Sequence, residues 1–484
     1  MRQLGSPKFF AMKKSFFIGN LGFVVLLNIL VKSVWIFGID RNVQNICGAT
    51  SYGSYFALLN LCILFQILLD MGLYYHNTKV VAGNNHLLAL YFPNILALKV
   101  LLSGVFAALV FAAGWLLGYH YEQMVLLGIL IFNQVLLGFI SYFRSNLGAL
   151  HMFKRDGVIS VLDRLLVIIA GGIIIYFFSD WLTINLFALL QTAAYLLTVG
   201  IAFYFLYQSF NFSGVKFKPR LFLPLLKRGL PYAALVLLMS VYMRSDAVVL
   251  ERISGKEAAG IYASAYRLQD AVNQLLLLVG TMLLPMYARL LQKKENVLSL
   301  AGFSGKMMFV LCSSLAIGSV FYSSKIMPFL YPQATAYSAA VCTAIMCALP
   351  GWGLCYVYGV LLTADKKLRF LLYISLAAAL LNVGLNLLLI PLYGALAAAW
   401  ISVLTMSSVG LVELGACMYY YGWKINYRLG LKLLLWILGS VGIFYLSIFA
   451  PWHWIIALCF ATIATIVLSF VFRIISVTQL KAIY

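Results

Sequence analysis

Charged residues are scarce in this chain, and acidic residues are scarcer still. Only 10% of its 484 residues are charged, and 13 acids stand against 34 lysines and arginines. A typical soluble domain carries about 25% charged residues. This chain is instead 64% hydrophobic, with a mean hydropathy of +0.99. A soluble core cannot absorb that much apolar sequence, so the composition predicts a membrane protein.

Patterns typical of catalytic and metal sites are also missing. The eight cysteines include no C-x-x-C pair, the five histidines are scattered, and the acids of the polar gaps occur singly. A membrane glycosyltransferase or glycan polymerase would be expected to carry paired acids or a base in sizeable loops. We therefore expect no enzyme activity, no metal and no bound cofactor, and we interpret the cysteines as small packing residues.

The apolar residues gather into about fourteen segments, each long enough to cross a hydrocarbon core of ~30 Å. The sequence therefore predicts an all-α, polytopic membrane protein with about 14 transmembrane helices. Among them, segments 15–38 and 51–73 form one adjacent pair, and segments 229–250 and 258–286 form another.

Lysines and arginines occupy every second gap between these segments. With the N-terminus in the cytoplasm, 26 of the 34 fall in cytoplasmic gaps, Arg164 being counted among them. The outer gaps hold Arg41, Arg252, Lys256 and Lys325. Because positive residues favour the cytoplasmic side, we expect both termini in the cytoplasm. This topology accounts for most of the net charge of +21, so the charge does not indicate a nucleic-acid partner.

A basic polar gap divides the chain into two similar parts. Residues 52–57 and 259–264, YGSYFA and AGIYAS, each follow a charged outer gap and open a helix that runs inward. We expect an N-terminal six-helix half, a basic cytoplasmic linker, a C-terminal six-helix half, and an extra two-helix pair with a cytoplasmic tail. Their boundaries are 1–208, 209–228, 229–421 and 422–484. Repeated halves usually enclose a central site and rock around it.

Several short motifs carry a resemblance to a known family. They lie at 48–55 and 69–73, at 244–246 and 260–267, at 283–285, and at 391–395. The first two pairs resemble the patterns G-x-x-x-Y-G-x-Y … L-D-x-G and R-x-D … G-x-Y-x-x-A-Y-R. With them, the chain resembles the polysaccharide-transporter (Wzx-type) branch of the MOP flippase superfamily, which also contains MATE exporters and lipid II flippases.

The resemblance implies a MOP/MATE-like fold and a function. It implies a flippase that moves an undecaprenyl-pyrophosphate-linked oligosaccharide from the cytoplasmic to the periplasmic leaflet of the bacterial cytoplasmic membrane. Such a protein serves the synthesis of a cell-surface polysaccharide, O-antigen-like or capsule-like. The expected partners are the lipid-linked glycan, membrane lipids and other membrane proteins of polysaccharide assembly.

Four cations lie inside apolar segments, where an unpaired charge is expensive and each is a candidate for function. They are Lys32, Lys99, Arg244 and Arg267. Cations on equivalent helices of the two halves could face one another across a central cleft. A pyrophosphate accepts bidentate hydrogen bonds from arginine and point-charge contacts from lysine. We therefore expect these four residues to bind the head group.

Structural explanations for the same cations stay open. Lys32 could reach the outer interface by snorkelling. Arg267 and Asp270 are three apart on one helical face and could form a structural pair. Arg244 and Asp246 should not pair directly, but one of them could meet the next helix. Lys99, six residues after Pro93, is the hardest to explain by snorkelling.

Four acids also lie within apolar segments: Asp70, Asp246, Asp270 and Glu413. Intramembrane carboxylates can carry protons or bind Na⁺, so one of them could couple transport to an H⁺ or Na⁺ gradient. Glu413 has no cation nearby in the sequence and is the leading candidate for this coupling. A structural or gating role is the better interpretation of Asp70.

Other functions stay open at this point. A lipid II flippase would need a similar cationic cleft. A MATE-type multidrug exporter shares the expected topology, but the family normally carries an acid in the first helix, where this chain has Lys32. A membrane glycosyltransferase or polymerase, and a scaffold without transport, are the remaining alternatives.

Overall fold

The computed structural model describes residues 28, 30–73, 77, 87–209, 217–424 and 426–475. Over these residues the chain is helical, with no strand. The N-terminal helices are α2 (Arg41–Phe65), α4 (Leu88–Leu116), α5 (Tyr121–Ala149), α6 (Phe153–Phe177) and α7 (Ile184–Ser209). The C-terminal helices are α8 (Phe222–Gln292), α9 (Leu298–Leu330), α10 (Ala336–Met346), α11 (Leu349–Leu354), α12 (Val360–Ala364), α13 (Leu368–Tyr393), α14 (Ala395–Tyr421), α15 (Tyr427–Ser447) and α16 (Trp454–Val471).

Shorter helical pieces adjoin them. The π-helices are η1 (Val34–Asp40) and η6 (Cys355–Gly359), and the 3₁₀-helices are η2 (Gln66–Leu69), η4 (Ser179–Trp181) and η5 (Pro219–Leu221). Residues 210–216 of the expected linker, and the expected cytoplasmic ends 1–27 and 476–484, lie outside the described residues.

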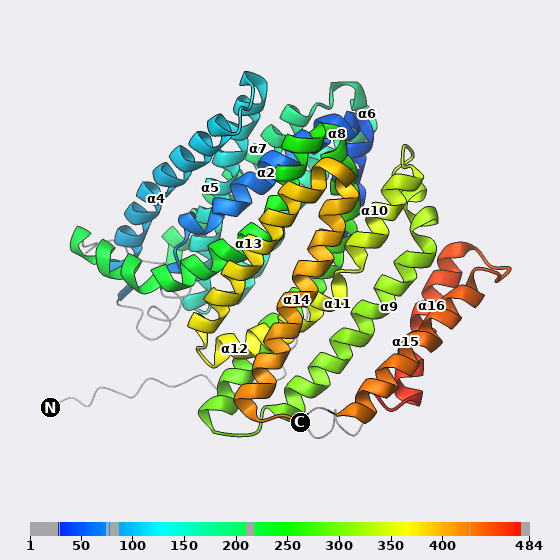
Figure 1. Cartoon of the computed structure of the whole chain (residues 1–484). Helices are drawn as coiled ribbons and strands as arrows, with labels where there is room; N and C mark the ends of the chain where they lie inside the picture. The colour runs from blue at the N-terminus through cyan, green and yellow to red at the C-terminus, as the bar shows by residue number, and fades with distance from the viewer. Residues whose placement is uncertain are drawn as a thin grey trace.

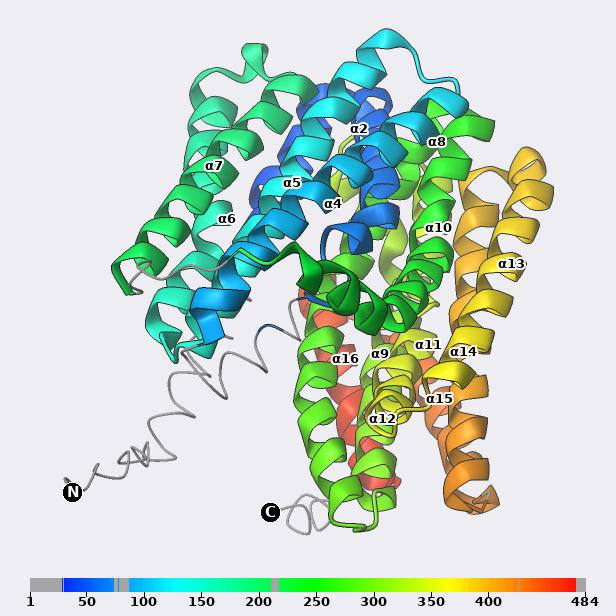
Figure 2. The same ribbon diagram turned by 90° about the vertical axis from the view of Figure 1, so that its left-hand side faces the viewer.

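Helices α4 to α7 gather on one side of the molecule, and α9 to α14 gather on the other (Figures 1 and 2). Contacts between the two groups run mainly through α2 and α8. Helices α15 and α16 pack on each other and on α9, at the edge of the bundle far from α4 (Figure 1). This arrangement resembles the two halves and the added helix pair that the sequence predicts. The domain boundaries stay predictions.

Two of the helical runs reverse direction at a glycine. Gly48 interrupts α2 with φ 81°, and Gly255 interrupts α8 with φ 90°. The hydroxyl of Tyr52 donates to Asp40 over 2.7 Å, although twelve residues of straight helix would span about 18 Å. Tyr262 likewise reaches Asp246, sixteen residues earlier, at 3.3 Å. Both helices therefore fold back on themselves, and glycine supplies the left-handed φ that each reversal needs.

Twelve helical runs in the described part of the chain are long and apolar enough to cross a membrane. The predicted pairs 15–38 with 51–73 and 229–250 with 258–286 appear as the two runs that reverse, Leu30–Leu69 and Pro219–Gln292. The all-helical membrane fold is confirmed, and the count of about fourteen crossings stays a prediction.

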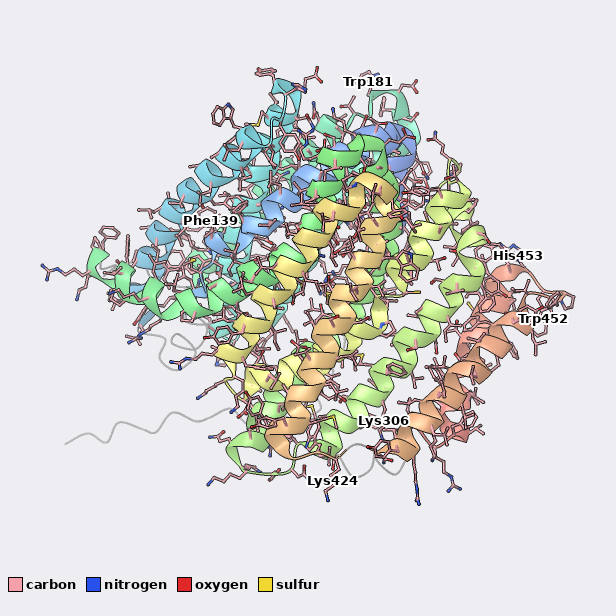
Figure 3. The ribbon with its side chains drawn as sticks, viewed as in Figure 1. Phe139, Trp181, Lys306, Lys424, Trp452 and His453 are labelled. Carbon is pink, nitrogen blue, oxygen red and sulfur yellow. The ribbon has the colours of Figure 1, made fainter. Side chains whose placement is uncertain are left out.

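The ends of the bundle differ in chemistry. Figure 3 places Lys306 and Lys424 toward one end of the helices and Trp181 at the other. We call these the basic end and the Trp181 end. The Gly48 reversal lies at the Trp181 end, because Cys47 contacts the carbonyl oxygen of Leu182 at 3.5 Å. The separation of lysines from tryptophan agrees with the alternation of charge in the sequence.

The two reversing helices meet near the Trp181 end in a reciprocal backbone contact. A Cβ atom on Gly53 would overlap the carbonyl oxygen of Lys256, and one on Gly260 would overlap that of Ala49. Gln44 donates to the carbonyl of Gly260 over 2.9 Å. The repeated motifs of the two halves thus pack against each other, and each requires a residue without a side chain at its contact.

Side chains reinforce this contact. Gln123 of α5 donates 3.1 Å hydrogen bonds to Ser54 of α2 and to Glu251 of α8. Arg252 pairs with Glu251 at 2.8 Å and donates to the carbonyl of Leu117 at 2.9 Å. Glu251 is buried. The Trp181 end is therefore closed by backbone packing and by a buried polar cluster that joins α2, α5 and α8.

We expect Gly260→Ala to lower the thermal stability of the detergent-solubilised protein, because its methyl group has no room against Ala49. Overpacking of this kind costs about 1–3 kcal/mol. Gly302→Ala is the matched control, since it lies within α9 and its Cβ would meet no atom within 4 Å. Equal melting temperatures of the two variants, measured by size-exclusion fluorescence, would contradict the tight contact.

Candidate functional site: a cationic seam between the halves

Arg267 of α8 is the centre of a polar network between the two halves. Its Nε lies 2.6 Å from Oδ2 of Asp40 in η1, and its Nη2 donates to the Tyr52 hydroxyl over 2.7 Å. Tyr52 in turn donates to Asp40. Asp40 and Tyr52 are buried, and the Arg267 side chain is 16% exposed. Three groups thus satisfy one another between residues more than 200 positions apart.

Arg244 extends this network more loosely. Asp270 lies 3.5 Å from Nη1 of Arg267 and 3.9 Å from Nη2 of Arg244. The guanidinium of Arg244 also stands 5.5 Å from the centre of the Tyr266 ring, within cation–π range. The structure therefore contains the Arg267–Asp270 pair considered as an alternative, and Asp270 is shared by both arginines.

Lys32 lines a cavity of about 430 Å³ between the helix around residue 32 and α8. Its Nζ donates to Oε1 of Gln274 over 2.7 Å. Within the described part of the chain Lys32 takes part in no ion pair. Positions 267, 270 and 274 share one face of α8, so Lys32 lies about 10 Å along that helix from Arg267.

Lys99 lies apart from the other three cations. It is 2% exposed, and its Nζ donates to the carbonyl of Leu69 over 2.7 Å. Asp70 is its ion-pair partner at 3.3 Å. The structure thus joins two predicted site residues, Lys99 and Asp70, but it does not bring Lys99 to the cavity that Lys32 lines. A role for Lys99 in binding the head group stays a prediction.

Asp246 belongs to a polar cluster of the C-terminal half. Its two carboxylate oxygens accept hydrogen bonds from Asn386 at 2.7 Å and from Tyr262 at 3.3 Å. Asn382 connects the cluster to Ser245 at 3.1 Å. Asp246 is 3% exposed and has no ion-pair partner among the described residues. A buried acid with only neutral neighbours can take up a cation or a proton.

Glu413 of α14 is buried beside the π-helix η6. Its Oε2 has no hydrogen-bond partner, and a Cβ on Gly359 would lie 2.7 Å from its Oε1. Single turns of π-helix occur frequently at functional sites. The structure places no cation against this carboxylate within the described residues, which agrees with the sequence pattern that singled it out.

Sequence reasoning missed Asp40, the strongest partner of Arg267. It interpreted Asp40 as a single acid of an outer gap, whereas the residue ends the π-helix η1 and is buried. The internal repeat could have identified Asp40. Asp40 stands eight residues before Gly48, and Asp246 stands nine residues before Gly255, so the two acids occupy nearly equivalent places in the halves.

Arg164, which the sequence pattern assigns to the cytoplasmic gaps, lies eleven residues inside α6, about 16 Å along the axis from the start of that helix. Its place relative to the membrane stays a prediction.

This chain resembles a known protein family and several solved structures. The family described as "Polysaccharide biosynthesis protein" matches residues 21–291. No curated protein sequence matches the chain.

Solved structures share the fold. A lipid II flippase, MurJ, in an inward closed conformation is 16% identical with a TM-score of 0.68, and the match covers 95% of this chain and 99% of that one. An inward-facing multidrug resistance MATE family transporter of the MOP superfamily has 14% identity and a TM-score of 0.63, over 80% and 94% of the chains. A MOP superfamily transporter from Pyrococcus furiosus has 16% identity and a TM-score of 0.57, over 84% and 96%.

We expect the buried pair of Asp40 and Arg267 to be energetically coupled. Asp40→Asn alone leaves a buried arginine partly unpaired, which costs about 3–5 kcal/mol. Asp40→Asn with Arg267→Gln should lose clearly less than the sum of the single variants, measured by thermal unfolding in detergent. Asp180→Asn, an exposed acid at the same end of the bundle, is the control. Strictly additive losses would contradict the pairing.

Proposed function

Because this chain belongs to the polysaccharide biosynthesis protein family, we propose that it is a flippase for an undecaprenyl-pyrophosphate-linked oligosaccharide. It is a multi-pass membrane transporter with the fold of MOP-superfamily proteins. The glycan would cross the bacterial cytoplasmic membrane, from the leaflet at the basic end to that at the Trp181 end. It would serve the synthesis of a cell-surface polysaccharide.

The observation that carries this proposal is Lys32 in its cavity. Lys32 donates its hydrogen bond to a neutral amide. Arg244 and Arg267 lie along the same contact between α2 and α8, which we call the seam. A desolvated pyrophosphate needs compensating charge to cross, and a cation without a carboxylate partner can supply it. The lipid tail would remain outside the cavity in the bilayer, so only the head group would have to pass.

Transport would proceed by alternating access of the two halves. Gly53 and Gly260 close the Trp181 end, so an outward-open state requires this contact to separate. Arg267 bridges the same seam through its ion pair with Asp40, and this ion pair must break during that motion. A pyrophosphate bound at the arginines would compete with Asp40 and Asp270 for the same donors, which would link binding to opening.

We expect completed undecaprenyl-linked oligosaccharide to accumulate on the cytoplasmic side in a deletion strain. Lys32→Gln and Arg267→Gln should fail to reverse this, whereas Lys293→Gln, a cation paired with Glu295 on the surface, should restore export. Mass spectrometry of lipid-linked glycans and an impermeant glycan probe give the measurement. Unfinished glycans would indicate an enzymatic step instead, and accumulated lipid II would indicate a lipid II flippase. No change in any lipid-linked sugar would favour a drug exporter.

Coupling to a proton gradient is a second part of this proposal. Glu413 has the unpaired buried oxygen that protonation would satisfy, whereas Asp246 sits among amide and hydroxyl groups that suit Na⁺. In proteoliposomes, Glu413→Gln should abolish the response of transport to a pH gradient, and the exposed acid variant Glu257→Gln should keep it. Loss of a sodium response in Asp246→Asn alone would assign the coupling to Na⁺.

A further inference from the structure

Helix α6 packs in parallel register against the helix that carries Lys32. Asn28 donates to the hydroxyl of Ser160 over 3.1 Å. Eleven residues further along both helices, a Cβ on Gly171 would lie 3.4 Å from the side chain of Ile39. Because both separations are eleven residues, the intermediate positions are also level. Four residues after the first contact, this register places Lys32 level with Arg164.

Arg164 lies on the face of α6 that makes these contacts. Positions 160, 164 and 171 follow the spacing of one helical face. Asn28, the partner of Ser160, lines the cavity together with Lys32. The side chain of Arg164 is 35% exposed, so its guanidinium is accessible.

Arg164 is weakly held where it stands. Among the described residues its one ion pair is with the preceding residue, Asp163, at 3.8 Å. At 3.8 Å this contact is longer than a hydrogen bond, so Asp163 does not hold the guanidinium in a bidentate pair. The other oxygen of Asp163 is buried without a hydrogen-bond partner. A like charge beside Lys32 is unfavourable, and a bound anion would relieve it.

We propose that Arg164 and Lys32 form a two-cation binding site for the pyrophosphate group, on the cavity side nearest the basic end. This inference rests on the proposed function and adds to it a residue that supplies a bidentate donor. Lys32 contributes a point charge and Arg164 a planar fork, a combination that fits a pyrophosphate better than a single carboxylate. The head group would meet this pair before it reaches Arg244 and Arg267, which are already engaged with acids.

The test uses the purified full-length protein in detergent at low salt, with inorganic pyrophosphate as the probe. Arg164→Gln should weaken its binding about tenfold or more, as loss of a hydrogen bond between charged groups does. Arg164→Lys should restore part of it. Arg155→Gln is the matched control: it removes an arginine from the same helix, nine positions earlier and therefore on the opposite face. Equal affinities in Arg164→Gln and Arg155→Gln would overturn the proposal.

Asp163→Asn gives an independent arm in case Arg164→Gln does not fold. Removing the competing carboxylate should tighten pyrophosphate binding severalfold, and unchanged or weaker binding would also overturn the proposal. Export of lipid-linked glycan separates this inference from the flippase itself. If the wild-type protein exported no such glycan, the flippase proposal would fail, while a difference between Arg164→Gln and Arg155→Gln would stand. If Arg164→Gln bound and exported normally, only the two-cation site would be lost.

Discussion

The reciprocal approach of Gly53 and Gly260 to the backbone of the opposite half is the constraint on which the rest of the structure depends. Helices in lipid gain little from the hydrophobic effect when they associate, so close backbone contact and polar pairing must hold them together. The contact fixes α2 against α8 at the Trp181 end, and it aligns the repeated motifs of the halves. With that register set, Asp40 and Tyr52 come opposite Arg267, and Lys32 comes opposite Gln274. The site is thus a consequence of how two glycines pack.

Charge balance explains why the seam tolerates so many cations. Lys32, Arg164, Arg244 and Arg267 face Asp40, Asp163 and Asp270, which leaves one positive charge in excess if all are ionised. The pairs differ in closeness: Arg267 lies 2.6 Å from Asp40, whereas the contacts of Arg244 and Arg164 are 3.9 Å and 3.8 Å long. Buried pairs repay their desolvation only when the geometry is good. The looser cations therefore retain much of their capacity to attract an anion, and the tight one holds the halves together.

The sequence predicted the class, the helical segments and the residues that carry charge into the membrane, because each of these depends on local composition or on the alternation of charge between gaps. It also identified the motifs that pack together, through the repeated Gly-x-Tyr pattern. It could not assign Asp40 correctly. Asp40 lies near the expected end of a segment, where hydropathy cannot distinguish a residue in a polar gap from one turned into the protein. Nor could it separate Lys99 from the other cations, because its pairing with Asp70 depends on how η2 ends, which no periodicity records.

Lys99 lies apart from the other cations because it belongs to the opposite end of the same seam. A Cβ on Gly229, near the start of α8, would overlap the carbonyl oxygen of Met71, so the turn that follows η2 also approaches α8 closely. Lys99 binds the carbonyl of Leu69 and the carboxylate of Asp70, the two residues before this approach. Its charge thus fixes the backbone that closes the seam beyond the cavity, while Gly53 and Gly260 close it at the Trp181 end. Lys32 and its cavity, with Arg244 and Arg267, lie between these two glycine contacts. In the proposed alternating access these contacts would separate in turn, and Lys99 lies outside the cavity, at one of them.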